Sequence, residues 1–211
     1  MTVNVLVLGA GGRIARWAVD MLGREDVELT LLTREQTRLP DVPPGARVVE
    51  GGVRDPEVLG QALQGQDVVY ANLAGDLDEQ ARAIVAAMGA ASVRRLVFVT
   101  ALGIYDEVPG AFGRWNTQTI GTGTLRTYRA AADTITTSGL DYTILRPAWL
   151  SDKDEIDYEV TTRGEPFRGT TVSRKSVAAL AVDIIKDPSR WVGADVGVNK
   201  PGTEGDRPVF D

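Results

Sequence analysis

Residues 3–34 read VNVLVLGAGGRIARWAVDMLGREDVELTLLTR, and this stretch decides the fold. Its first six residues form a short apolar run, typical of a strand that is buried on both faces of a parallel sheet. The glycines that follow permit a tight turn, and from Arg13 the apolar residues recur at helical spacing. Gly23 ends this helix, and a second apolar strand runs from Val27 to Thr33. The order strand, glycine turn, helix, strand predicts a βαβ unit.

The glycines of the turn have the spacing of a dinucleotide-binding motif. The pattern G-x-G-x-x-G fails because Ile14 occupies the place of its last glycine, whereas G-x-x-G-x-x-G/A fits as Gly9, Gly12 and Ala15. At such a turn the bare main-chain amides at the helix start face a pyrophosphate. The alternative is a turn that serves only a tight strand-to-helix corner. The turn residues expected to bind a cofactor are Gly9, Ala10, Gly11, Gly12, Arg13 and Ile14.

The end of the second strand, Thr33 and Arg34, indicates which cofactor is preferred. A carboxylate at this point accepts a hydrogen bond from the free 2′-hydroxyl of NAD(H), whereas an arginine binds the 2′-phosphate of NADP(H). Arg34 therefore favours NADP(H) over NAD(H), and Arg13 could add a second positive charge. The alternative is that both arginines are solvated surface residues.

Composition excludes several kinds of chemistry. The chain has 211 residues, of which 43% are hydrophobic, and this suffices for one core in a single domain. It has no Cys and no His, which excludes disulfides, thiolate chemistry, zinc sites built from His or Cys, and Ser-His-Asp or Cys-His catalysis. No metal-binding residue is expected. A net charge of -6 disfavours nucleic acids and anionic membranes as partners. With no signal peptide or membrane-spanning run, we expect a cytoplasmic monomer or small homo-oligomer.

Strands and helices alternate as far as Leu150, without repeats or a linker. This alternation predicts an α/β fold, a doubly wound parallel sheet (Rossmann fold), with ligands at the carboxyl ends of the strands. We expect one domain over residues 1–211, in which residues 1–150 form the dinucleotide-binding core and residues 151–211 a small extension that covers the substrate side. Further strands are expected at residues 47–50, 67–71, 96–100, 142–147 and 195–199.

Polar residues mark the starts of three further helices. Asp55 and Ser173 are expected to cap helix starts, and Asp76 with Glu79 resembles a capping box. The helix that follows Asp76 is expected to end at Gly89.

Residues 101–123 are expected to form a long loop, a candidate lid or pocket wall. Its aromatic residues, Tyr105, Phe112 and Trp115, would then face a substrate. The alternative is that these side chains only pin the loop to the body of the protein.

The whole chain resembles the atypical short-chain dehydrogenase/reductases, specifically the compact NmrA-like NAD(P)H-binding proteins. The most specific mark is SGLDYTILRP at residues 138–147, and the other marks are GAGGRIA at 9–15, the turn at 52–55, LGIY at 102–105 and SRKSVA at 173–178. The resemblance implies that Val53 contacts the adenine, residues 72–74 the ribose and pyrophosphate, and residues 147–149 the nicotinamide. The cofactor residues expected outside the glycine turn are Thr33, Arg34, Gly52, Val53, Asn72, Leu73, Ala74, Thr100, Ala101, Pro147, Ala148 and Trp149.

The chain departs from the catalytic members of this superfamily. Those members use a tyrosine whose pKa is lowered by a lysine four residues later, assisted by a serine. Four residues after Tyr128 stands Ala132, the place of the serine is Ala101, and Gly52 replaces an aspartate. Without the lysine, Tyr128 should keep a pKa of about 10 and be a poor base. Tyr105 and Tyr128 are the candidate catalytic residues.

Two hypotheses follow from this. The first is an NADPH-dependent reductase of a small flat acceptor, such as a quinone or flavin, which needs no strong acid from the enzyme. Its substrate pocket would contain Tyr105, Phe112, Trp115 and Trp149. The second is a non-catalytic NADP(H) sensor or regulatory protein. A sugar-nucleotide epimerase is disfavoured because the chain is short and lacks the triad.

Overall fold

The computed structural model describes residues 2–39 and 41–210. In chain order the elements are β1 (Val3–Leu8), α1 (Arg13–Leu22), β2 (Val27–Thr33), the 3-10 helix η1 (Gln36–Arg38), β3 (Arg47–Glu50), α2 (Pro56–Leu63), β4 (Val68–Ala71), α3 (Leu77–Ala91), β5 (Arg95–Val99), α4 (Gly110–Ile120), α5 (Thr122–Thr136), β6 (Asp141–Pro147), β7 (Trp149–Ser151), β8 (Glu159–Thr162), β9 (Thr171–Ser173), α6 (Arg174–Lys186) and β10 (Ala194–Asn199).

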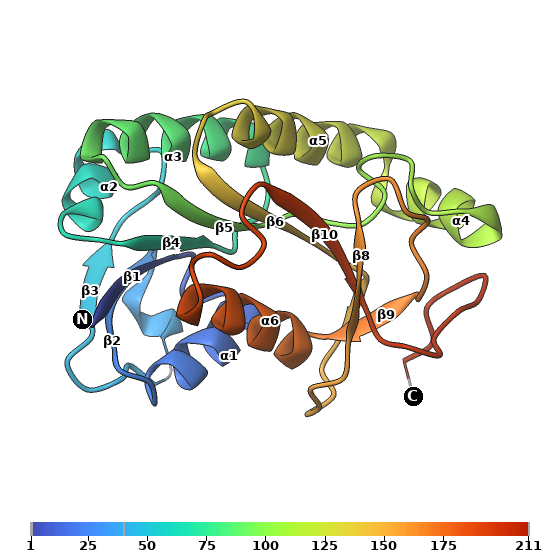
Figure 1. The fold of residues 1–211 in the computed structure, drawn as a ribbon, viewed down its shortest axis with the longest axis horizontal. Helices are drawn as coiled ribbons and strands as arrows, with labels where there is room; N and C mark the ends of the chain where they lie inside the picture. The colour runs from blue at the N-terminus through green and yellow to red at the C-terminus, as the bar shows by residue number, and fades with distance from the viewer. Residues whose placement is uncertain (1, 40, 211) are drawn as a thin grey trace.

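One eight-stranded sheet forms the centre of the molecule, in the order β3-β2-β1-β4-β5-β6-β10-β8 (Figure 1). All neighbours in it are parallel except β10 and β8, which are antiparallel. The chain runs outward from β1 through β2 to β3, and then returns to β4 on the other side of β1. This reversal opens a crevice at the carboxyl ends of β1 and β4, where Rossmann folds bind ligands. The prediction of a doubly wound parallel sheet is confirmed.

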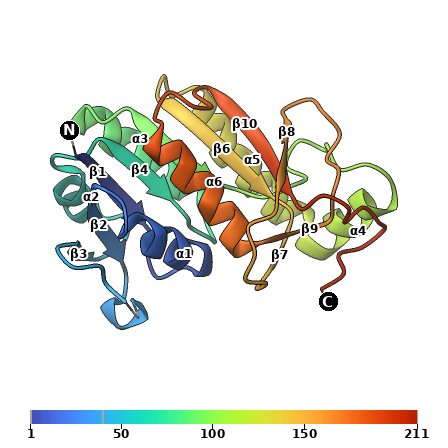
Figure 2. The ribbon, with the colours of Figure 1, turned by 60° about the horizontal axis from the view of Figure 1, so that its bottom comes forward.

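Helices cover both faces of the sheet. Figure 2 shows α1 and α6 side by side on one face, and α2, α3 and α5 on the other. Each layer has its own cluster of buried side chains. On α1 the buried positions include Ile14, Ala18 and Leu22, which belong to the stripe expected from the sequence. Burial of these stripes removes apolar surface from water on both sides of the sheet and fixes the strand ends relative to one another.

The segment 101–123 is not a loop throughout, because it contains helix α4. Glycines at positions 110 and 113 of the helix and at its C-cap, position 121, give this segment a low intrinsic helix propensity. For this reason the sequence did not indicate a helix. Gly113 is required by packing, since a Cβ there would lie 2.0 Å from the carbonyl oxygen of Val108. Phe112 and Asn116 are the buried residues of α4.

The helix caps follow the sequence in two of three cases. The side chain of Asp55 accepts hydrogen bonds from the N–H groups of Glu57 and Val58, and that of Ser173 accepts one from Ser176. The expected capping box is wrong, because the Asp76 side chain makes no cap hydrogen bond.

The start of α3 is instead held by an arginine. Arg54 lies 2.6 Å from Glu79 and 3.5 Å from Asp76, so both carboxylates form ion pairs rather than a capping box. At its other end α3 continues to Ala91, two residues beyond the expected Gly89, and ends at Ser92 in the left-handed conformation with a φ of 59°.

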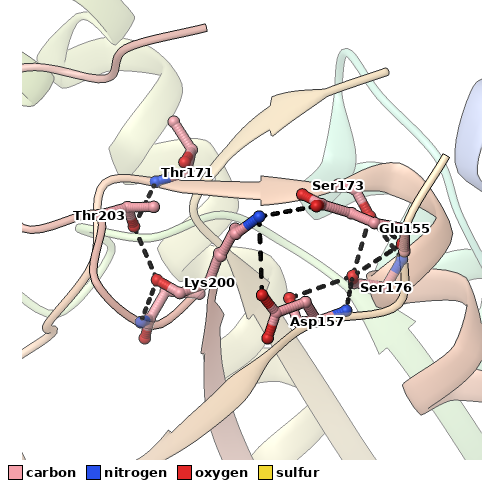
Figure 3. A network of polar contacts seen from close by, with 8 residues as sticks. Glu155, Asp157, Thr171, Ser173, Ser176, Lys200 and Thr203 are labelled. Atoms are coloured by element: carbon pink, nitrogen blue, oxygen red, sulfur yellow. Dashed lines mark hydrogen bonds and ion pairs between the residues drawn. The ribbon is translucent and has the colours of Figure 1, made fainter. Parts of the chain in front are cut away.

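The carboxyl-terminal residues extend the sheet and are tied down by polar contacts (Figure 3). Lys200, after β10, lies 2.7 Å from Glu155 and 3.6 Å from Asp157. Thr203 accepts a hydrogen bond from the N–H of Thr170 on its carbonyl oxygen and donates its hydroxyl to the carbonyl of Lys200. These bonds fix the path of residues 200–203, from which the chain continues toward Phe210.

Candidate functional site

A cleft of about 980 Å³ runs along the carboxyl ends of the parallel strands. All of the predicted cofactor residues except Ala10 line it. Ala10 is 1% exposed and belongs to the core cluster beneath α1, so its side chain points away from the cleft. Leu102 also lines it, within the predicted strand end 100–105. Further lining residues that were not expected from the sequence are Arg38, Arg54, Gln80, Ile120, Thr124, Leu150, Arg174 and Phe210.

The glycine turn brings the backbone close to β4. Gly9 has a φ of +75°, and a Cβ there would lie 2.4 Å from the carbonyl oxygen of Asn72. A Cβ at Gly12 would lie 2.8 Å from the Asn72 side-chain nitrogen. Because Gly12 is the N-cap of α1, no side chain satisfies the first N–H groups of that helix. The turn therefore offers bare amides to an anion, as a pyrophosphate requires.

One end of the cleft, at β2 and β3, suits the adenosine half of a dinucleotide. Val53 and Arg34 lie here, together with Arg38 from η1. Arg38 forms an ion pair with Glu35 at 2.5 Å, whereas Arg34 has no ion pair among residues 2–39 and 41–210. Arg38 was missed because only the fold of the connection after β2 brings it to the cleft.

Arg13 does not supply the second charge at this end. Its side chain forms an ion pair with Asp152, which follows β7. The Arg13 side chain therefore extends toward the carboxyl-terminal part of the chain. The second positive charge at the adenosine end, which was expected from Arg13, comes from Arg38 instead.

The other end of the cleft, at β5 and β6, contains an apolar and aromatic surface. Leu102, Ile120 and Trp149 line it. The indole nitrogen of Trp149 donates a hydrogen bond of 2.9 Å to the buried Asn116, and this bond fixes the orientation of the ring. Asn116 was missed because its segment was expected to be a loop.

Tyr128 lines the same end and is half-buried. Burial raises the pKa of its hydroxyl, and a backbone hydrogen bond from Gly75 acts in the opposite direction. Since Ala132 stands where a lysine would lower the pKa, Tyr128 carries its proton at neutral pH. It can donate a hydrogen bond to a ligand but cannot act as a base.

The structure places the other three predicted pocket aromatics outside the cleft lining. Phe112 is buried and lies 6.1 Å from Trp115, measured between ring centroids, and Trp115 in turn lies 4.8 Å from Trp149. These residues support Trp149 without reaching the cleft. Phe112 and Trp115 therefore match the alternative prediction, in which the aromatic side chains only pin this segment to the body of the protein.

Tyr105 is also outside the cleft. Its ring lies between 4.2 and 5.4 Å from the guanidinium groups of Arg129, Arg146 and Arg163. Burial raises the pKa of its hydroxyl, and the negative charge of the nearby Asp195 carboxylate acts in the same direction. Tyr105 is therefore a packing residue within the turn after β5, and of the two candidate catalytic tyrosines only Tyr128 lines the cleft.

The charge of the cleft is opposite to that of the chain. Its ionisable lining residues, apart from Tyr128, are five arginines and one acid, Arg13, Arg34, Arg38, Arg54, Arg174 and Glu35. In a chain with a net charge of -6, this concentration of arginines favours an anionic ligand. Residues 9–188 match the family described as NAD(P)H-binding. The chain belongs to this family.

The NAD(P)H-binding protein is similar to several solved structures. A Rossmann-fold NAD(P)-binding family protein from Shigella flexneri is 48% identical over 100% of both chains, with a TM-score of 0.86. A short-chain dehydrogenase/reductase (wide type) from Veillonella parvula DSM 2008, in complex with NADP, is 31% identical over 100% of both chains, with a TM-score of 0.93. The anaerobillin reductase ChuY from Escherichia coli O157:H7 shares the fold at 20% identity and a TM-score of 0.80, over 96% of this chain and 99% of that one. No curated protein matches the sequence.

The turn after β5 is held by a buried ion network. The Arg146 guanidinium of the NAD(P)H-binding protein forms ion pairs with Glu107 and Asp195, and all three side chains are at most 6% exposed. Glu107 also accepts hydrogen bonds from the N–H groups of Gly103 and Tyr105, at 3.0 and 2.9 Å. The network joins β6, β10 and the turn that borders the apolar end of the cleft.

Two further features of this NAD(P)H-binding protein bear on its chemistry. Within residues 2–39 and 41–210, no group of acidic side chains is placed to hold a metal ion. None of the helices in the same part of the chain is long and apolar enough to cross a membrane.

Proposed function

We propose that the protein is an NADPH-dependent oxidoreductase that reduces a small flat acceptor, such as a quinone or flavin, without a Tyr-x-x-x-Lys pair. The observation that carries this proposal is the lining of a single cleft, which has arginines at the adenosine end and apolar and aromatic side chains at the other. The NADP complex of the Veillonella parvula protein supports it. We also infer the NmrA-like subtype, a cytoplasmic location and a monomer or small homo-oligomer.

A preference for NADP(H) over NAD(H) is part of this proposal. Arg34 and Arg38 both lie at the end of β2, where a 2′-phosphate would sit beside the ribose. Arg34 has no carboxylate partner in the described part of the chain, so its guanidinium is available for bidentate binding of a phosphate.

An Arg34→Glu variant is expected to bind NADPH at least about tenfold more weakly, because a carboxylate repels the 2′-phosphate. NADH binding should be unchanged or tighter. Titration calorimetry with both nucleotides measures the two effects. Arg126→Glu, on the exposed surface of α5, makes the same change in net charge away from the cleft and serves as the control. Equal losses for NADPH and NADH would contradict the assignment.

The chemistry at the apolar end requires little from the protein. A bound nicotinamide supplies the hydride. Trp149, held by Asn116, and Leu102 would pack against a flat ring and exclude water. Tyr128 would donate a hydrogen bond to an acceptor oxygen or nitrogen, and the proton that completes reduction of a quinone or flavin comes from water.

Turnover should therefore be independent of pH between about pH 6 and pH 9. The Tyr128 hydroxyl keeps its proton below its pKa, and burial raises that pKa above the ordinary value of 10.0, so its protonation does not change in this range. A pH profile of kcat at saturating NADPH and acceptor measures this. A bell-shaped profile with a midpoint near pH 7 would contradict the proposed mechanism.

The second candidate function is a non-catalytic NADP(H) sensor or regulatory protein. It is favoured by the missing lysine, since Ala132 leaves Tyr128 without an activating cation. NADPH oxidation measured against a panel of quinones and flavins separates the two functions. Tight NADPH binding without turnover on any acceptor would favour the sensor, and turnover on a quinone or flavin supports the reductase.

A further inference from the structure

A carboxylate already lies between two of the arginines of the cleft. Asp152 forms an ion pair with Arg13, the first residue of α1, and with Arg174, the first residue of α6, the second at 2.8 Å. The two helices lie side by side on the same face of the sheet (Figure 2). Two guanidinium groups thus share one carboxylate, and one positive charge is not neutralised. Burial and the nearby Arg13 both lower the pKa of Arg174, as expected for two cations in proximity.

A second cavity, of about 430 Å³, lies at this cluster; we name it the Asp152 cavity. It is lined by Arg13, Leu150, Ser151, Asp152, Lys153, Arg174 and Phe210. Four of these residues, namely Arg13, Leu150, Arg174 and Phe210, also line the main cleft, so the two spaces are contiguous. Lys153 has no ion pair among the residues that the structure describes. The cavity therefore contains three cationic side chains and one acid.

The Asp152 carboxylate is well placed to be exchanged for a ligand. Its side chain is 61% exposed and that of Arg13 is 63% exposed, and exposed ion pairs of this kind contribute little to stability. Arg174 differs, because its side chain is 15% exposed and also donates a hydrogen bond to the carbonyl of Leu150. Arg174 is thus a fixed cation, and Asp152 is its replaceable partner.

The lining of the Asp152 cavity also includes one aromatic side chain. Phe210 is 55% exposed and lines both cavities. The chain that leads to it is fixed at Thr203 and Lys200 by the polar contacts of Figure 3. A ligand with a flat ring and an anionic substituent would find an apolar surface and a cationic surface in one space.

We propose that the Asp152 cavity binds an anionic substituent of the acceptor, a carboxylate or phosphate, with Arg174 and Arg13 as ligands and Asp152 as the group that it displaces. The proposed function then narrows to acceptors that carry both a flat ring and an anion, and the inference rests on that function for the identity of the cleft. The Arg13 main chain remains part of the glycine turn, while its side chain binds the anionic substituent of the acceptor.

Flavins provide a matched pair of probes, because FMN and riboflavin share one ring and differ in a phosphate. Binding of each is followed by flavin fluorescence, with and without saturating NADP⁺, so that no turnover is needed. FMN is expected to bind at least about tenfold more tightly than riboflavin. Arg174→Gln and Arg13→Gln should each remove most of that difference. Asp152→Asn should increase it, because the competing carboxylate is gone, and none of the three variants should change riboflavin binding.

Arg24→Gln is the control, since Arg24 is an exposed arginine at the far end of α1 that pairs with Asp20. Asp152→Asn changes an exposed side chain and should not affect folding, so it still tests the inference if Arg174→Gln does not fold. FMN binding no tighter than riboflavin binding, including no binding of either, overturns the inference. Equal weakening of both flavins, or weakening of NADPH alone, in the arginine variants also overturns it and assigns these arginines to the cofactor. Failure of the proposed reductase would instead appear as an FMN preference without NADPH oxidation.

Discussion

An Arg146→Met variant is expected to lose about 3–5 kcal/mol of the free energy of unfolding, because it leaves buried carboxylates without a cation. The Arg146 side chain is 1% exposed and forms ion pairs with Glu107 and Asp195, which are 6% and 3% exposed. Methionine fills a similar volume but cannot neutralise either carboxylate. Urea unfolding, followed by circular dichroism, measures the loss as a lower transition midpoint.

The matched control is Arg94→Met at an exposed ion pair. Arg94 and Asp141 lie 3.1 Å apart, with side chains 63% and 43% exposed. Such a pair contributes about 0–1 kcal/mol, so the control should unfold close to the wild-type midpoint. Equal losses in the two variants would mean that Arg146 does not hold the network together. The loss at Arg146 should also loosen the turn after β5, which Glu107 holds through Gly103 and Tyr105.

A Gly12→Val variant is expected to bind NADPH at least about 100-fold more weakly, which corresponds to about 2.7 kcal/mol. Its Cβ would lie 2.8 Å from the Asn72 amide nitrogen, and its methyl groups would occupy the space in front of the uncapped start of α1. The Gly12 φ of -69° suits any residue, and the 2.8 Å contact is with the end of the Asn72 side chain, which can rotate away, so the fold should be retained. Calorimetric titration with NADPH, together with a circular dichroism spectrum, separates lost binding from lost folding.

Gly60→Val provides the comparison within the same chain. Gly60 lies in α2, and a Cβ at that position meets nothing within 4 Å. This variant should bind NADPH like the wild type. Unimpaired NADPH binding by the Gly12 variant would show that the glycine turn does not receive the pyrophosphate.

The doubly wound parallel sheet could be predicted because the signals for its strands and helices are local. The apolar runs of β1 and β5, the glycine turn and the caps Asp55 and Ser173 each act within a few residues. Once a parallel sheet is inferred, the position of the cleft follows, because ligands bind at the carboxyl ends of the strands. This is why nearly all of the expected cofactor residues line it. Ala10 is the exception, because its side chain is 1% exposed and packs in the core.

The parts that could not be predicted depend on contacts between distant residues. Strands β7, β8 and β9 are only three or four residues long. β8 is a strand because it pairs with β10 of the main sheet, and β7 and β9 are strands because they pair with each other. Tyr105 was assigned to the site by residue type, but arginines 24, 41 and 58 positions later enclose its ring. Arg174 reaches the cleft only because α6 packs beside α1, and no pattern near it in the sequence indicates that.

The cations that border the main cleft are all arginines, and none of its described lining residues is a lysine. Amine-reactive dyes would consequently spare the lining of the main cleft and label lysines outside it, among them Lys153 in the Asp152 cavity. Dicarbonyl reagents such as phenylglyoxal, which modify guanidinium groups, would act in the opposite way and block the site.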